Sequence, residues 1–299
     1  MYKRQGYLWQ YLVLTLLDKG SFQEAHQTLF QIWPDLDDLN DLSPKERDII
    51  RGYKRAFLAS ITIHSAIDAH KSRQFSRLAG DLLPENELLG HSIAYGHYGS
   101  SCLHLGYTDK AIESLDQAMH LSRLVEFKII YLLWFCYKAQ AVAAQGALTQ
   151  ARELYLEATI LAENMGVQKS NVFSNAVIGL GNLYYEWNDL QSAERYLREG
   201  VSVAETGDYL DRLIFGYLSF AQIRIAMLDF EAVEAKVKHG LAAAGKYDHP
   251  MNIILGLEAI QARVHLARGD LQAAAQWAKN VVVPTEIQDL NSLVEYQLR

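Results

Sequence analysis

Four side chains that could bind a metal ion lie close together in the sequence. They are His91, His97, Cys102 and His104. A protein metal site needs three or four ligands that converge on one point. The successive spacings of six, five and two residues do not place all four on one face of a helix, although His97 and His104 would share a face. We therefore expect hydrogen-bonded or solvated histidines here, and no metal site.

Catalytic arrangements are equally sparse. The acid pairs Asp37–Asp38 and Glu85/Glu87 fall in polar stretches that read as linkers, where solvated charge is the simplest explanation. The run Gly179–Gly181 is not a dinucleotide-binding loop, because no predicted strand precedes it, and the sequence has no Gly-x4-Gly-Lys-Ser/Thr phosphate loop. We predict that the chain is not an enzyme and holds no cofactor of its own.

Composition narrows the class of protein further. Half of the 299 residues are hydrophobic, which is ample for a large core, and the net charge of −7 argues against a nucleic-acid-binding surface. The two cysteines, Cys102 and Cys136, fit a reducing compartment and are expected to be buried thiols. The most apolar run, Ile129–Tyr137, is far shorter than the roughly 20 residues that span a membrane. We expect a cytoplasmic protein that contacts neither nucleic acid nor membrane directly.

The elements that must position any functional side chain are predicted to be helices. Apolar residues recur at three- and four-residue spacing, as at Leu183, Trp187 and Leu190, and no segment shows the sustained alternation of a strand. The prolines fall between these periodic segments. Ser43-Pro44-Lys45-Glu46 predicts a helix start with a capping box between Ser43 and Glu46. The sequence predicts an all-α fold.

A turn motif of the type Gly-Asp-Leu-x-x-Ala recurs along the chain at a period of about 41 residues. Each copy predicts a hairpin of two helices, called here the first and second helix. The seven copies therefore predict seven hairpins in a single solenoid over residues 1–299, with turns near residues 20, 64, 106, 146, 188, 228 and 269.

Two columns of small residues support this interpretation. Five residues after each turn stand Ala25, Ala69, Ala111, Ala151, Ala193, Val233 and Ala274, where valine is the one exception. Seven residues before the last five turns stand Gly99, Ala139, Gly181, Ala221 and Ala262. Because helices approach closely only where their side chains are small, the two helices of each hairpin should cross at these columns.

The clearest copy resembles the tetratricopeptide repeat (TPR). Leu180-Gly181-Asn182-Leu183-Tyr184, followed by Ala193, Leu197 and Gly200, matches that family's spacing. The period of about 41 residues is longer than the family's usual repeat, so the helices or linkers must be longer. The resemblance implies an α-α superhelix whose first helices line a concave groove.

A narrower resemblance carries functional implications. The stretches Gly181–Gly240 and Ala262–Ala278 look like the helical-repeat region of the large ATP-dependent, MalT-like regulators of the LuxR family of transcription factors. In that family an N-terminal NTPase and a C-terminal helix-turn-helix flank the repeats, which sense an inducer or partner and support self-association. The resemblance implies a non-catalytic sensor and oligomerisation region, with ATP bound only by an upstream module of the parent protein. Neither end carries a polar cap, so we expect a fragment of a longer chain, with Met1–Gln5 not native and an eighth first helix opening at Leu293–Arg299.

Candidate ligand contacts form a column six residues before the last five turns. This binding column consists of Ser100, Gln140, Asn182, Gln222 and Arg263, with Tyr185 and Phe215 as aromatic neighbours and Leu133 and Ile178 as apolar ones. Amide side chains can pair with both the N–H and C=O groups of an extended peptide, and would also suit a sugar-like ligand. A wet groove alone would explain the polarity too. The predicted partner is a peptide, a protein or a small-molecule inducer, and the alternative function is a free-standing scaffold that binds a partner in its groove.

Overall fold

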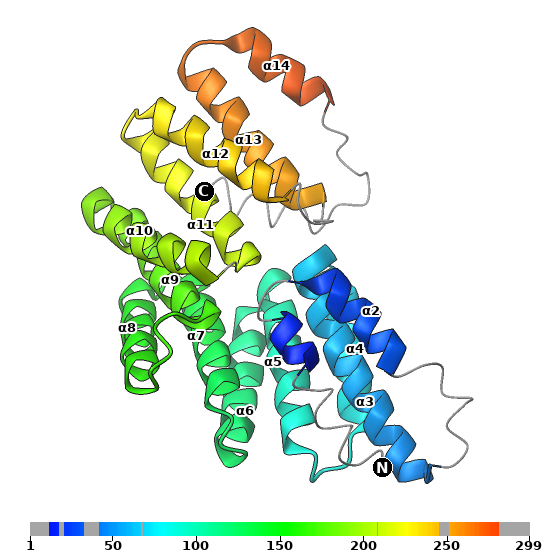
Figure 1. Cartoon of the computed structure of the whole chain (residues 1–299). Coiled ribbons are helices and arrows are strands. Elements are labelled where there is room, and N and C mark those ends of the chain that lie inside the picture. Colours follow the sequence, from blue (N-terminus) through cyan, green and yellow to red (C-terminus); the bar gives the residue numbers. More distant parts are fainter. Residues whose placement is uncertain are drawn as a thin grey trace. The chain divides into compact units, whose positions relative to one another are not determined.

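The computed structural model describes residues 12–17, 21–32, 42–66, 68–207, 209–244 and 251–280. Every regular element within these ranges is a helix, so the predicted all-α class is confirmed (Figure 1). The helices are α2 (Phe22–Ile32), α3 (Pro44–Ile61), the π-helix η2 (Thr62–Ala66), α4 (Ala69–Leu82), α5 (Leu88–His104), α6 (Thr108–Leu124), α7 (Lys128–Ala144), α8 (Leu148–Asn164), α9 (Asn171–Glu186), α10 (Leu190–Gly207), α11 (Leu210–Ala226), α12 (Phe230–Ala244), α13 (Met251–Ala267) and α14 (Leu271–Asn280). None of these described helices combines the length and apolarity needed to cross a membrane.

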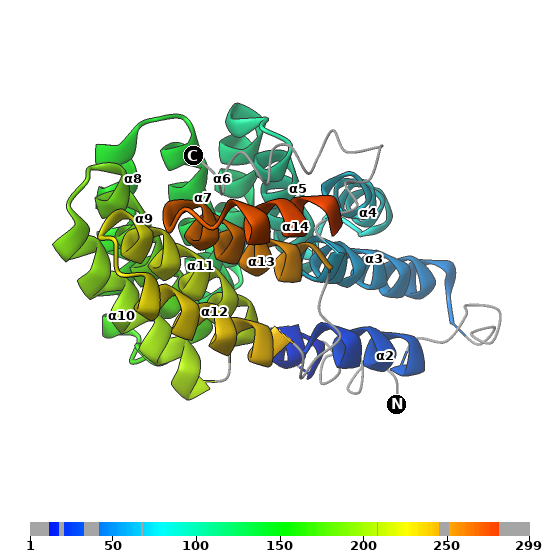
Figure 2. The same ribbon diagram turned by 90° about the horizontal axis from the view of Figure 1, so that it is seen from above.

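The chain divides into two compact units, Met1–Leu154 and Tyr155–Arg299, and α8 begins in the first and ends in the second. Within the first unit, the hairpins α3–α4 and α5–α6 and then α7 pack in chain order, each helix against the next. Within the second unit, the hairpins α9–α10, α11–α12 and α13–α14 pack in the same way (Figures 1 and 2). A single solenoid over the whole chain remains a prediction.

Five of the predicted turns join the two helices of a hairpin through one residue in the left-handed region. These residues are Gly106, Gly146, Asn188, Leu228 and Gly269, with φ values of 77°, 82°, 58°, 59° and 81°. At Gly106 the helix end is closed by two backbone hydrogen bonds, from Tyr107 N to Cys102 O (2.8 Å) and from Gly106 N to Leu103 O (3.0 Å). Glycine suits this position because a β-carbon there crowds the backbone.

The first two predicted turns differ from these five. The turn near residue 64 coincides with η2, after which Asp68 caps α4 by accepting a hydrogen bond from Lys71 N (2.9 Å). The turn near residue 20, the residues Met1–Gln5 and the expected helix at Leu293–Arg299 lie outside the described residues.

Both columns of small residues lie where the helices of a hairpin cross. All the predicted members of both columns are buried. A β-carbon added to Gly181 on α9 would lie 2.7 Å from Leu197 Cγ and 3.2 Å from Ala193 O on α10. A β-carbon at Gly99 on α5 would lie 2.8 Å from Leu115 Cγ on α6. The close crossing predicted from the sequence is therefore confirmed, and it fixes which face of each first helix points away from its own hairpin.

The capping box predicted at the start of α3 is also confirmed. Ser43 Oγ accepts a hydrogen bond from Glu46 N (3.3 Å), while Glu46 Oε2 accepts one from Ser43 N (3.1 Å). Pro44 opens the helix, where its missing N–H costs nothing.

Candidate ligand-binding site

Three members of the binding column lie on the successive first helices of the second unit. Asn182, Gln222 and Arg263 follow directly after the buried column residues of α9, α11 and α13. Helix α9 contacts α11, and α11 contacts α13 (Figure 1). The three residues therefore form a row, one on each of these neighbouring first helices. Asn182 is exposed, whereas Gln222 and Arg263 are half-buried. The row presents two amides and one guanidinium.

Both predicted aromatic neighbours belong to the same unit and are half-buried. Tyr185 on α9 packs against a buried cluster that includes Ile178 and Phe220. Phe215 on α11 lies seven residues before Gln222 and hence on the same helix face. These rings place apolar surface beside the polar row.

Sequence reasoning missed a polar pair next to Phe215. Arg212 Nη1 donates a hydrogen bond to Asn175 Oδ1 (3.0 Å), and the Arg212 guanidinium carbon lies 5.8 Å from the centre of the Phe215 ring. Asn175 is seven residues before Asn182 and shares its face of α9. That seven-residue spacing is the signal that could have identified Asn175. Arg212 had no such signal, because only the packing of α9 on α11 brings it to Asn175.

The remaining two members of the column lie in the first unit and differ from each other. Gln140 on α7 is half-buried. Ser100 on α5 is fully buried, with 0% of its surface exposed, and its hydroxyl has no hydrogen-bond partner among the described residues. Because Ser100 presents no surface to solvent, we leave it out of the site proposed below.

Of the histidines singled out in the sequence, His97 lies in the packed interior of the first unit. His97 is 4% exposed, and its ring lies edge-on to Trp134 (5.1 Å between centres) and to His64 (5.9 Å). Burial lowers the pKa of His97 well below its usual value, and the neighbouring His64 lowers it further. The Tyr137 hydroxyl lies 3.4 Å from His64 Nε2. Burial therefore favours the neutral form of the His97 imidazole.

The other potential ligands do not join His97. His91 Nε2 lies 3.2 Å from the Pro84 carbonyl oxygen, and Cys102 is buried, which raises the pKa of its thiol. In the part of the chain that the structure describes, no three side chains of His, Cys, Asp or Glu come together as a metal site would require.

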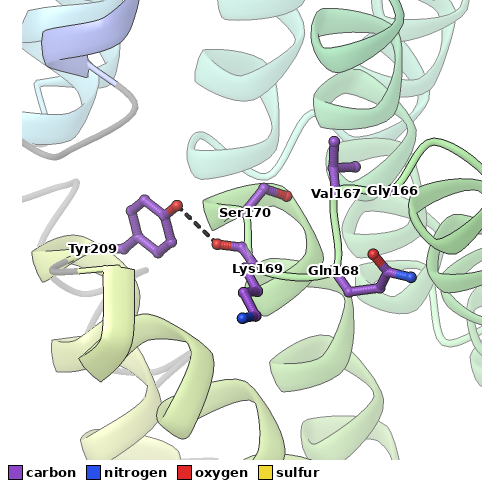
Figure 3. Close-up of a pocket in the computed structure, with 6 residues that line it drawn as sticks. All are labelled: Gly166, Val167, Gln168, Lys169, Ser170 and Tyr209. Carbon is purple, nitrogen blue, oxygen red and sulfur yellow. Dashed lines mark hydrogen bonds between the residues drawn. The ribbon is translucent and has the colours of Figure 1, made fainter.

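A hollow of about 600 Å³ lies between the α8–α9 connection and the start of α11 (Figure 3). It is lined by Gly166, Val167, Gln168, Lys169, Ser170 and Tyr209. The Tyr209 hydroxyl donates a hydrogen bond to the Lys169 carbonyl oxygen (2.9 Å), and none of the predicted site residues lines the hollow. This hydrogen bond ties the α8–α9 connection to the start of α11.

Comparison with known families identifies one match. The family model described as "MalT-like TPR region" matches residues 54–299. No curated protein matches the sequence.

Several solved structures share the fold at low sequence identity. A Rap protein complexed with competence and sporulation factor superposes with a TM-score of 0.63 at 12% identity, over 98% of this chain and 99% of that chain. NprR in complex with its cognate peptide NprX gives 0.62 at 14% identity, over 100% of this chain and 78% of that chain. The apo form of RapI gives 0.55 at 10% identity, over 91% and 84%. At these identities the likeness establishes the helical-repeat fold.

Proposed function

The chain belongs to the family of MalT-like TPR regions, and from this premise we propose that it is a non-catalytic sensor that binds a peptide. The site is the row Asn182, Gln222 and Arg263, flanked by Tyr185 and Phe215. The family and the repeat fold support a ligand- or protein-binding role. The choice of a peptide and of these residues is our proposal.

The observation that carries the proposal is the register of the polar row. One polar side chain stands at the same position of each first helix in the second unit, and each directly follows a buried small residue. The backbone of an extended peptide offers alternating N–H and C=O groups, and Asn and Gln side chains can pair with both. The half-buried rings of Tyr185 and Phe215 provide contact area for apolar peptide side chains.

One further observation supports a peptide ligand. The Rap and NprR structures, which share this fold, contain competence and sporulation factor and the peptide NprX, respectively. We also propose Gln140 of α7 as a ligand contact within the first unit, since it holds the equivalent position of its own helix.

The biological context is proposed to be transcription regulation in the cytoplasm. The chain would act as the sensor and self-association region of a LuxR-family regulator, and ligand binding would shift the parent between a resting and an assembled state. This predicts that the surrounding reading frame encodes a phosphate-loop NTPase upstream and a helix-turn-helix downstream. A reading frame without either module would instead favour a free-standing scaffold.

The binding site is tested by selection and substitution. A random heptapeptide library and a set of short oligosaccharides are passed over the immobilised chain, and retained species are identified by mass spectrometry. We expect retained peptides whose affinity falls at least tenfold in the double variant Asn182→Ala/Gln222→Ala. The matched control is Gln191→Ala, an exposed amide on α10, which should bind as the unmodified chain does. Equal affinity in the double variant would refute this site, and selective retention of oligosaccharides would refute the peptide.

A further inference from the structure

Two neighbouring hairpins of the second unit expose large apolar side chains at their turns. Trp187 at the α9–α10 turn is 37% exposed, and Met227 and Leu228 at the α11–α12 turn are 41% and 73% exposed. Trp187 and Met227 hold the same place in their hairpins, directly before the left-handed residue. Because α11 packs against both α9 and α10, the two turns belong to adjacent hairpins. We call Trp187, Met227 and Leu228 the tip patch.

Leu228 has a backbone conformation that its side chain disfavours. Its φ is 59°, in the region that Gly106, Gly146, Gly269 and Asn188 occupy at the equivalent turns. A residue with a β-carbon crowds the backbone there, and leucine lacks the short polar side chain that lets asparagine tolerate it. At 73% exposure, the leucine gains little from packing within the fold. The local structure therefore gives a reason for glycine at this turn, and none for leucine.

Trp187 is held in position by an aromatic stack. Its ring lies edge-on to Tyr184, with 5.6 Å between centres, and Tyr184 stacks on Tyr196 at 5.2 Å and 13°. Tyr184 in turn packs against the buried cluster of this unit. A tryptophan fixed in this way loses little conformational entropy on binding, which is a property of the residues that dominate protein interfaces.

The surroundings of the tip patch are acidic. Glu186 and Glu231 are exposed next to it, and neither forms an ion pair with a described residue. Asp189 is also exposed and accepts a hydrogen bond from Ser192 N (3.1 Å) at the start of α10. Of the carboxylates at these two turns, Asp229 is balanced by Arg224 (3.1 Å). Arg195 offsets part of the charge of Asp189, so the charge left without an ion-pair partner is that of Glu186 and Glu231. This charge favours a cationic partner and disfavours a second copy of this acidic chain.

The third turn of the unit is excluded from the patch for a structural reason. Leu271 is exposed. The leucine at the equivalent position of the α9–α10 hairpin, Leu190, is covered by a buried cluster that includes Phe220 of the next hairpin. The hairpin of Leu271 is the last one described, so the exposure of this leucine is expected. Trp187, Met227 and Leu228 stand at the turns themselves.

We propose that the tip patch is a docking surface for a basic amphipathic helix of a partner protein. The apolar side of that helix would cover Leu228 and Trp187, and its lysines or arginines would face Glu186, Asp189 and Glu231. The tip patch shares no residue with the proposed peptide site, so the two can be tested with different variants.

The probe is a synthetic amphipathic 14-residue helix of leucine and lysine, with its leucine and glutamate counterpart as the charge control. Binding of each fluorescently labelled helix to the full chain is measured by anisotropy. We expect the lysine helix to bind and the glutamate helix not to bind. Leu228→Gly should weaken binding about tenfold, and Glu231→Lys should weaken it further at low salt. Leu124→Gly, at an exposed leucine of the first unit, should leave the affinity unchanged.

The Leu228→Gly variant also separates binding from folding. Because glycine suits a φ of 59°, this variant should melt at the same or a higher temperature than the unmodified chain. Lost binding in such a variant supports the docking surface. Equal binding by the Leu228→Gly chain, or equal binding of the lysine and glutamate helices, would overturn it. Concentration-dependent dimers in sedimentation that Leu228→Gly abolishes would also overturn it, since a second copy would then occupy the patch.

Discussion

The close crossing of α9 and α10 predicts that Gly181→Val strongly destabilises the second unit. The added β-carbon would lie 2.7 Å from Leu197 Cγ, and it would also approach Ala193 O at 3.2 Å, which is backbone and cannot rotate away. Overpacking of this kind costs about 1–3 kcal/mol. Valine recovers only about 0.4 kcal/mol through its better helix propensity. We therefore expect a net loss of about 2 kcal/mol in the free energy of unfolding.

The measurement is urea denaturation followed by circular dichroism at 222 nm. With an m-value of about 2 kcal/mol/M, the midpoint for the second unit should fall by about 1 M. The matched control is Gly80→Val in α4, where an added β-carbon has no atom within 4 Å. That variant should change stability by less than about 0.5 kcal/mol. If Gly181→Val unfolds at the midpoint of the unmodified chain, the two helices do not cross at this residue and the repeat packing is wrong.

Three further predictions concern helix capping, a buried base and an ion pair. Ser43→Ala removes the capping box with Glu46 and should cost about 1 kcal/mol, visible as a lower melting temperature. Burial lowers the pKa of His97, so the folded chain binds a proton at this side chain less readily than the unfolded chain does. The free energy of unfolding is therefore at its full value above about pH 6.5 and falls as the pH drops below that value. Melting temperatures should therefore drop from pH 7 to pH 5, and should drop less in His97→Gln; identical pH profiles would contradict the assignment. Glu194→Gln leaves the mostly buried Arg224 with less compensation and should cost about 1–3 kcal/mol in urea titrations, whereas an unchanged midpoint would show that the pair contributes nothing.

Most of the fold follows from local sequence signals. The turns at Gly106, Gly146 and Gly269 are predictable because glycine fits a left-handed helix end, and the crossing points are predictable because small residues recur in register. Two features of the fold had no such signal. The π-helix at Thr62–Ala66 adds one residue to a helical turn, and no distinctive residue type marks this in the sequence. The division between the two units at Leu154 falls inside the continuous helix α8.

The candidate site is predictable only in part. Helical period and register place Asn182, Gln222 and Arg263 at equivalent positions of three helices, and these helices are neighbours in one unit. They do not reveal that Ser100, at the same register, is fully buried, because burial depends on the helices that pack around α5. Arg212 was missed for the same reason, since its contact with Asn175 arises between two helices. Exposure and partner choice are properties of packing between hairpins, and a repeat pattern carries little information about them.

The first helices of the second unit are proposed to hold a peptide. Hydrogen–deuterium exchange of the full chain, with and without a heptapeptide retained in the selection, tests it most directly. We predict slower exchange in the amides of α9, α11 and α13 around Asn182, Gln222 and Arg263, with little change in α10, α12 and α14. Protection confined to the second helices, or to the first unit alone, would contradict the proposed site.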